Sequence, residues 1–181
     1  MYGLVNRGLE ELICRQHGSA TWERIKAEAG VEEEVFVRMD AYPDEITYRL
    51  VACASQVLGV SPEQLLHDFG VHWTQYTGRE GYKALLETAG RSLPEVLSNL
   101  DDLHVRVGLM YPQLRPPSFR CTDQTSTSLV LHYHSAREGL GPMVVGLVKG
   151  LGQHFGVEVS VTPRGQRANG EDHDSFEVTW H

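Results

Sequence analysis

Residues 111–118 read Tyr-Pro-Gln-Leu-Arg-Pro-Pro-Ser, and the sequence has a helical pattern before them and a strand pattern after them. Three prolines in eight residues cannot continue a helix, because proline lacks a backbone N–H and its ring clashes with the preceding turn. We interpret this segment as the junction between two subdomains.

Before this segment, apolar residues recur at helical spacing, and Ser61 and Ser92 have the surroundings of helix starts. Glu95, three residues after Ser92, is placed as a capping-box partner. Three glycines each follow a helical run, where a left-handed residue is common. The positions with helical spacing are Leu4, Val5, Leu9, Leu12 and Ile13, then Ile46, Leu50, Val51, Ala54, Val57 and Leu58, and the glycines are Gly30, Gly59 and Gly90.

After the proline-rich segment, residues 128–135 alternate between apolar and polar, which is typical of a strand. Residues 140–155 have a helical pattern, and residues 157–161 and 176–180 are strand-like. The sequence therefore predicts an α+β fold, in which helices precede a small antiparallel sheet packed by a helix.

The chain has 181 residues and a formal net charge of −8, which predicts one domain spanning residues 1–181 and disfavours nucleic acid or a membrane surface as a partner. The N-terminus lacks the pattern of a signal peptide and no long uncharged run is present, so we expect a cytoplasmic protein. Cys14, Cys53 and Cys121 have no CxxC spacing, so neither a disulfide framework nor a cysteine zinc site is indicated, and CxxCH haem attachment is excluded.

His104 is the first candidate for chemistry. A helix that begins at Ser92 would place it on one stripe with Leu93, Leu97, Leu100 and Val107. An imidazole in such an apolar space needs a hydrogen-bond partner or a metal, since leaving it unsatisfied costs about 1–3 kcal/mol. The residues alone leave two interpretations open: a hydrogen-bonded core histidine, or a ligand of haem iron.

Tyr133, Ser135 and Arg137 form the second candidate. A strand places residues two apart on one face at intervals of about 6.6–6.8 Å, so these three would form a row of hydrogen-bond donors. Such a row suits a dicarboxylate, because hydroxyls donate to carboxylates and arginine binds them with two parallel bonds. The two propionates of haem are one such dicarboxylate, another dicarboxylate is a second possibility, and a polar strand end is a third.

Together, Leu-Asp-Asp-Leu-His104-Val-Arg-Val-Gly, Pro112-Gln-Leu-Arg-Pro-Pro117 and Tyr133-x-Ser135-x-Arg137 resemble the haem nitric oxide/oxygen-binding (H-NOX) family. Residues 1–6, 139–147 and 170–174 share the resemblance. The family includes bacterial stand-alone sensors related to the haem domain of soluble guanylate cyclase. The resemblance implies a helical subdomain over about residues 1–65, an α/β subdomain over about residues 66–181, and non-covalent haem b between them. His104 matches the proximal iron ligand, the Tyr-Ser-Arg triad matches the propionate clamp, and Pro117 matches a proline that presses on the porphyrin.

The resemblance also implies a choice of gas. Oxygen-binding members have a distal tyrosine that donates to bound oxygen, and Met143 occupies the matching position. Methionine has no donor, so we expect selection against oxygen. The other haem-pocket residues by family position are Val5, Leu9, Trp73, Leu100 and Leu147, and a tryptophan such as Trp73 is more often simply a core residue. Some relatives bind zinc through cysteines and a histidine near the C-terminus, but residues 164–174 contain no cysteine and only His173, so we expect no zinc there. Alternation places His132 and His134 on the solvent face of their strand.

The function that the resemblance implies is a haem-based nitric oxide sensor that binds nitric oxide and carbon monoxide and excludes oxygen. Nitric oxide would release His104, and the resulting shift would regulate a separate protein, either a histidine kinase or a diguanylate cyclase/phosphodiesterase. No nucleophile–base pair, phosphate loop or HExxH motif is present, so we do not expect an enzyme. Two alternatives remain: a haem-dependent oxygen-using or redox enzyme, and a non-haem domain that binds a dicarboxylate.

Overall fold

The computed structural model describes residues 1–79, 87–111 and 113–181. Its elements are, in order, α1 (Gly3–His17), α2 (Ser19–Glu28), α3 (Asp44–Leu58), α4 (Pro62–Arg79), α6 (Leu93–Ser98), α7 (Leu100–Met110), β1 (Ser118–Thr122), β2 (Ser128–His134), α8 (Gly141–Phe155), β3 (Val159–Gly165), the short 3-10 helix η1 (Arg167–Asn169) and β4 (Asp174–Trp180).

The strands form an antiparallel sheet in the order β1-β2-β4-β3, so the predicted α+β class and antiparallel sheet are confirmed. The two predicted N-terminal helices are confirmed as α1 and α3. At the expected start of α4, the backbone N–H of Gln64 donates to the hydroxyl of Ser61. Gly30 and Gly59 have the expected left-handed conformation, whereas Gly90 is not among the described residues with positive φ.

Two expectations about residues 92–122 were wrong, and one strand was missed. The single helix expected from Ser92 past His104 is two helices, α6 and α7, which are interrupted at Asn99. The backbone of Asn99, with φ of −104° and ψ of 8°, is not helical, and its side-chain amide donates to the carbonyl of Ala89. In the expected capping box, Ser92 makes no side-chain cap bond in the described structure, and Glu95 accepts from the backbone N–H of Arg91. Strand β1 was not predicted, because five residues after a proline run give too short a pattern.

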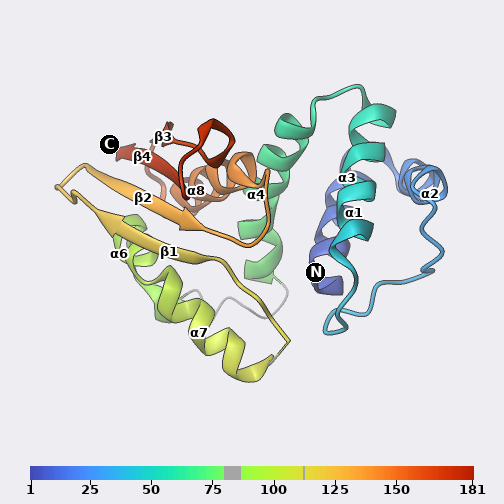
Figure 1. Ribbon diagram of the computed structural model, residues 1–181, viewed down its shortest axis with the longest axis horizontal. Helices are drawn as coiled ribbons and strands as arrows, with labels where there is room; N and C mark the ends of the chain where they lie inside the picture. Colours follow the sequence, from blue (N-terminus) through green and yellow to red (C-terminus); the bar gives the residue numbers. More distant parts are fainter. Residues whose placement is uncertain (80–86, 112) are drawn as a thin grey trace.

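Two groups of buried side chains stabilise the fold. The first, which we call the helical core, includes Leu9, Leu12, Ile13, Trp22, Ile25, Leu50, Leu65 and Phe69 of α1 to α4. The second, the sheet core, includes Leu93, Val96, Leu97, Leu129, Leu131, Val144, Val148, Phe176 and Val178 of α6, α8 and the sheet. Figure 1 shows α4 standing between the sheet with its covering helices and the helices α1 to α3.

We expected the proline-rich segment 111–118 to be the junction between two subdomains, but the residues on its two sides belong to one core. Leu93 and Val96 before it and Leu129 after it belong to the same sheet core. Pro116 and Pro117 directly precede β1, and α7 and β1 pack together. A helix break marks the end of an element and does not by itself mark a boundary between cores.

Helices α4 and α8 cross at very close range through glycines. A Cβ atom at Gly146 would lie 1.9 Å from the carbonyl oxygen of His67, and one at Gly70 would lie 2.2 Å from the carbonyl oxygen of Met143. Gly150 is equally restricted, since its Cβ would lie 2.4 Å from the hydroxyl of Thr74. Only glycine allows the two backbones to approach this closely, and the contact fixes α8 against α4.

Candidate functional site

A cavity of about 280 Å³ lies between the two cores. It is bounded by α1, α4, α7, α8 and the segment that leads from α7 into β1, and most of its wall is apolar. The apolar lining includes Leu4, Val5, Trp73, Leu100, Leu103, Val107, Pro117, Phe119, Leu147 and Leu151, and the polar lining includes Arg38, Thr74, His104, Arg115 and Arg137. An apolar cavity with a few polar groups is the usual form of a small-molecule or cofactor site.

His104 enters this cavity from α7. Its ring stacks on Phe119 with centroids 5.7 Å apart, and Phe119 contacts Tyr133 with centroids 5.2 Å apart. Burial lowers the pKa of His104, an effect that the Asp101 carboxylate and the Pro117 backbone oppose. Its Nδ1 atom is buried and has no hydrogen-bond partner among the described residues. Burial therefore favours the neutral form of this imidazole, and its Nδ1 atom is not satisfied by a described residue.

The expected row of Tyr133, Ser135 and Arg137 is not a single strand face. Strand β2 ends at His134, so Ser135 and Arg137 lie in the connection to α8. Tyr133 is only 4% exposed and belongs to the sheet core, where burial raises its pKa and a hydrogen bond with Ser135 opposes the rise. The Ser135 hydroxyl in turn accepts from the backbone N–H of Arg137. Of the three residues, Arg137 alone is in the cavity lining.

Three partners hold the guanidinium of Arg137 at the wall of the cavity. Nε and Nη2 donate to the two carboxylate oxygens of Asp44 at 2.8 and 3.2 Å, and Nη1 donates to the carbonyl of Arg115 at 2.9 Å. A guanidinium carries five N–H bonds, so two of them remain without a partner among the described residues. Arg137 can therefore bind Asp44 and a carboxylate in the cavity at the same time.

Asp44 was missed from the sequence, and so was Phe119. Asp44 lies in the first turn of α3, where an acidic residue is common, and nothing in the sequence signals a partner 93 positions away. Phe119 lies on the strand that the sequence pattern did not reveal. Both residues can be recognised as part of the site only from the tertiary structure, in which distant elements come together.

The expected pocket residues divide into two groups. Val5, Trp73, Leu100, Pro117 and Leu147 line the cavity. Leu9 and Met143 are not in the lining: Leu9 is fully buried in the helical core, and Met143 packs against that core.

The histidines on the outer side of β2 also differ from expectation. His134 is exposed, but His132 is half-buried, and its Nδ1 lies 2.8 Å from Nε2 of His173. His173 therefore does not stand alone, although among the described residues no group of three side chains is placed to hold a metal ion. Within the same described ranges, no helix is both long and apolar enough to cross a membrane.

The residues of the cavity fit a haem group. An apolar wall suits the porphyrin ring, the buried imidazole of His104 with its unsatisfied Nδ1 atom suits the iron, and the two unused N–H bonds of Arg137 suit a propionate. This combination defines the class of the protein as a domain built to bind a metal-bearing, carboxylated cofactor.

Known proteins identify the family. The sequence model described as Haem-NO-binding matches residues 2–163, and the chain therefore belongs to the haem-NO-binding (H-NOX) family, whose domains bind haem and act as gas sensors. The chain is 34% identical to soluble guanylate cyclase gcy-35 of Caenorhabditis elegans, a match that covers 100% of this chain and 26% of that protein. Soluble guanylate cyclase gcy-31 of the same organism is 29% identical over 89% of this chain and 23% of its own length.

Solved structures agree on the fold. An H-NOX protein from S. oneidensis in the Fe(II)NO ligation state superposes with a TM-score of 0.91 at 19% identity, covering 100% of this chain and 99% of that one. The Fe(II) unliganded H-NOX protein from K. algicida superposes with a TM-score of 0.87 at 22% identity, covering 100% and 97%. The chain spans about a quarter of the length of the matched guanylate cyclases.

Proposed function

We propose that the chain is a haem-based nitric oxide sensor that binds haem b, takes nitric oxide and carbon monoxide as ligands, and excludes oxygen. Ferrous haem supplies an iron that binds these gases. The observation that carries the proposal is the buried imidazole of His104, whose Nδ1 atom has no partner among the described residues, in an apolar cavity whose wall also holds Arg137. His104 is the iron ligand, and Arg137, with Tyr133 and Ser135 behind it, holds the propionates.

The proposed selection against oxygen rests on Met143, which matches the family's distal donor position and lies outside the cavity lining. Methionine at position 143 has no N–H or O–H to donate to bound oxygen. The hydroxyl that α4 contributes to the cavity, that of Thr74, donates to the carbonyl of Val71. Neither group is therefore available to stabilise the negative charge that builds up on oxygen bound to ferrous iron.

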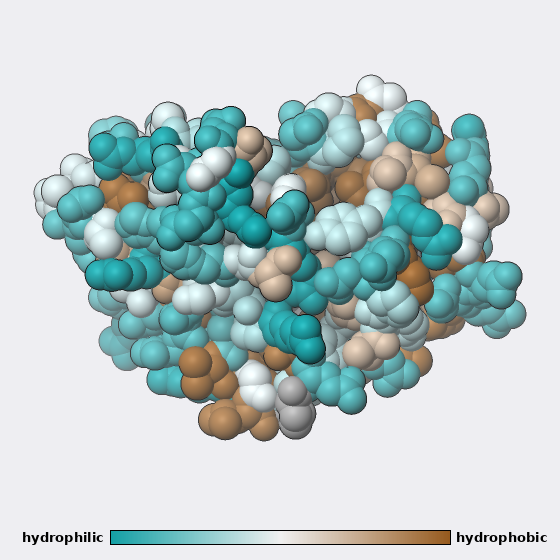
Figure 2. Space-filling view, viewed as in Figure 1, coloured by the Kyte–Doolittle hydropathy of each residue, from teal (hydrophilic) through white to brown (hydrophobic). Residues whose placement is uncertain are grey.

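Signalling follows from the position of His104 on α7. His104 would hold the haem iron, and its release on nitric oxide binding would leave α7 free to shift. The outward side of this helix carries Val105 and Leu109, which are 62% and 80% exposed. Figure 2 shows apolar atoms at the lower edge of the molecule, where Figure 1 places α7. A separate signalling protein, a histidine kinase or a diguanylate cyclase/phosphodiesterase, would receive the change.

The test is the optical spectrum of the purified chain after addition of haem. We expect an intense Soret band that shifts with carbon monoxide and with nitric oxide, and no stable oxygen-bound spectrum in air. His104→Ala should change the ferrous spectrum, and added imidazole should restore it, because the free base replaces the lost ligand. His154→Ala, at the far end of α8, is the matched control and should leave the spectrum unchanged.

Three outcomes would contradict the proposal. A missing Soret band would favour the non-haem dicarboxylate site. A stable oxygen-bound spectrum would show that the haem does not exclude oxygen, and would favour an oxygen-using or redox enzyme. A spectrum of His104→Ala identical to that of the wild type would show that His104 is not the iron ligand.

A further inference from the structure

Arg167, on η1, binds the connection that carries Ser135 and Arg137. Its Nη1 donates to the backbone carbonyl of Ser135 at 2.8 Å, and its Nη2 contacts the carboxylate of Glu138 at 3.2 Å. These two contacts flank Arg137 in the sequence. The segment from Ser135 to Glu138 is therefore held from the side of η1.

Arg167 is itself fixed to the sheet. Its backbone N–H donates to the carboxylate of Asp174 at 2.8 Å, and Asp174 begins β4 directly opposite Tyr133 on β2. Gly170, with φ of 94°, ends η1 in a conformation that favours glycine and allows this tight return. The position of the Arg167 guanidinium is thus set by the same strand pair that carries Tyr133.

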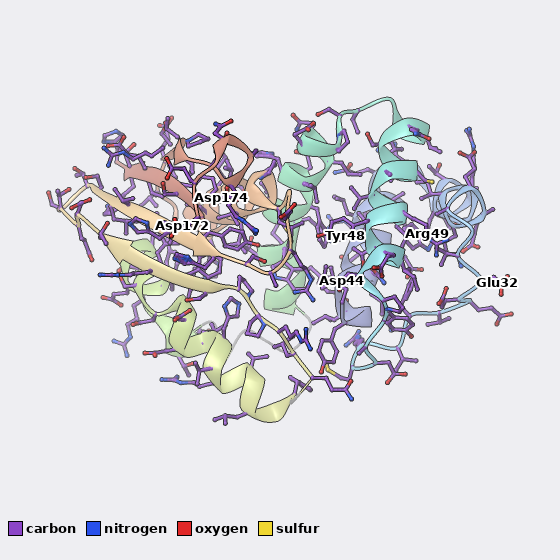
Figure 3. The ribbon with its side chains drawn as sticks, in the orientation of Figure 1. Glu32, Asp44, Tyr48, Arg49, Asp172 and Asp174 are labelled. Carbon is purple, nitrogen blue, oxygen red and sulfur yellow. The ribbon has the colours of Figure 1, made fainter. Side chains whose placement is uncertain are left out.

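Helix α3 holds the other side of the segment. The Tyr48 hydroxyl donates to the backbone carbonyl of Glu138 at 3.3 Å, and Asp44, one turn earlier, binds Arg137. Figure 3 shows Asp44 and Tyr48 on α3 on one side of the connection after β2, with Asp174 on the other side. The segment from Ser135 to Glu138 is therefore bound by α3 of the helical core on one side and by η1, which is fixed to the sheet, on the other.

The two contacts of Arg167 differ in strength. Glu138 is 81% exposed, and ion pairs with so exposed a partner contribute little to stability. The bond to Ser135 is partly buried and joins a charged donor to a backbone carbonyl, which makes it the stronger of the two. Ser135 is also the residue whose hydroxyl accepts from the backbone of Arg137.

We propose that Arg167 is a positioning residue of the carboxylate clamp: through the Ser135 carbonyl it fixes the place from which Arg137 reaches the cavity. This inference rests on the proposed binding of haem. Arg167 does not line the cavity, so it acts through Ser135 and Arg137 and does not touch the cofactor.

The experiment compares Arg167→Gln, Arg167→Lys and the control Arg164→Gln, an exposed arginine on β3. Each protein is loaded either with haem or with haem dimethyl ester, which lacks the propionate charges, and the rate of haem loss to an excess of a haem scavenger is measured. Arg167→Gln should lose haem about three- to tenfold faster than the wild type, which is the effect of losing one typical hydrogen bond. Arg167→Lys, which keeps a charged donor with a long reach toward the Ser135 carbonyl, should fall between the two, and Arg164→Gln should match the wild type.

With haem dimethyl ester, the difference between Arg167→Gln and the wild type should disappear, because the clamp then has no carboxylate to hold. A difference of the same size with the ester would mean that Arg167 acts through general stability, and would overturn the inference. Equal rates with ordinary haem would also overturn it, while leaving the proposed function intact. A wild type that takes up no haem would instead overturn the proposed function.

Discussion

Asp44 is the residue that ties Arg137 to the helical core. Burial on its own would raise the pKa of the Asp44 carboxyl, but hydrogen bonds from Arg137 and from the amino group of Met1 outweigh burial and hold the pKa below its ordinary value of 3.8. Because the folded protein binds a proton at Asp44 less readily than the unfolded chain does, this ion pair stabilises the fold above pH 3.8. The contribution is lost as the pH falls through the lower folded pKa.

Asp44→Asn should therefore lower the free energy of unfolding at neutral pH and flatten its fall below about pH 4. The effect should be modest, since the Asp44 side chain is 34% exposed and water screens the pair. Urea unfolding between pH 2.5 and pH 7 measures both changes. Asp40→Asn, at an exposed position nearby, is the control and should follow the wild-type profile. An Asp44→Asn profile parallel to that of the wild type would contradict this account.

Helices α4 and α8 are the elements whose contact brings Trp73 and Leu147 to the same cavity. Their backbones meet at Gly70, Gly146 and Gly150, where any side chain would overlap a carbonyl or a hydroxyl of the other helix. The helical pattern of residues 140–155 predicted α8 from the sequence, but it did not reveal that its glycines serve this close approach. Glycine inside a helix normally weakens it, and here the packing offsets that cost.

Gly146→Ala should lower the free energy of unfolding by about 3 kcal/mol, the upper range for overpacking, because the new methyl group would meet the His67 carbonyl. Gly108→Ala is the matched control, since its Cβ would have no neighbour within 4 Å and α7 has helical backbone there. That variant should raise the free energy of unfolding by about 0.4–1 kcal/mol. Chemical denaturation compares the two, and a tolerated Gly146→Ala would show that the helices can separate without cost.

The whole molecule has two cores with a cavity between them. The cavity lining takes Leu4 and Val5 from α1, which belongs to the helical core, and Leu100 and Phe119 from the sheet core. A ligand that fills the cavity therefore contacts both cores at once. Ligand binding stabilises only the state that contains the complete site, so it couples the two cores.

Haem should therefore protect both cores together. In hydrogen exchange followed by mass spectrometry, peptides of α1 and α3 and peptides of β2 and β4 should both gain protection when haem is added. Without haem, the two sets should open at different urea concentrations, because fewer contacts then join the cores. Protection confined to one core, with the other unaffected, would show that the cavity does not bridge them.

The sequence by itself determined the local features of this protein. Periodicity predicted α1, α3, α8 and most of the sheet. The motifs around His104 and around Tyr133 led to the family. Each of these signals is contained within a short stretch of sequence. Patterns of this kind are local, so they could not show that α6 and α7 separate at Asn99 or that both sides of the proline-rich segment share one core. The tertiary structure alone decided that Arg137 meets Asp44 and that Arg167 holds Ser135. Those contacts join residues 93 and 32 positions apart, and only the packing of whole elements brings such residues together.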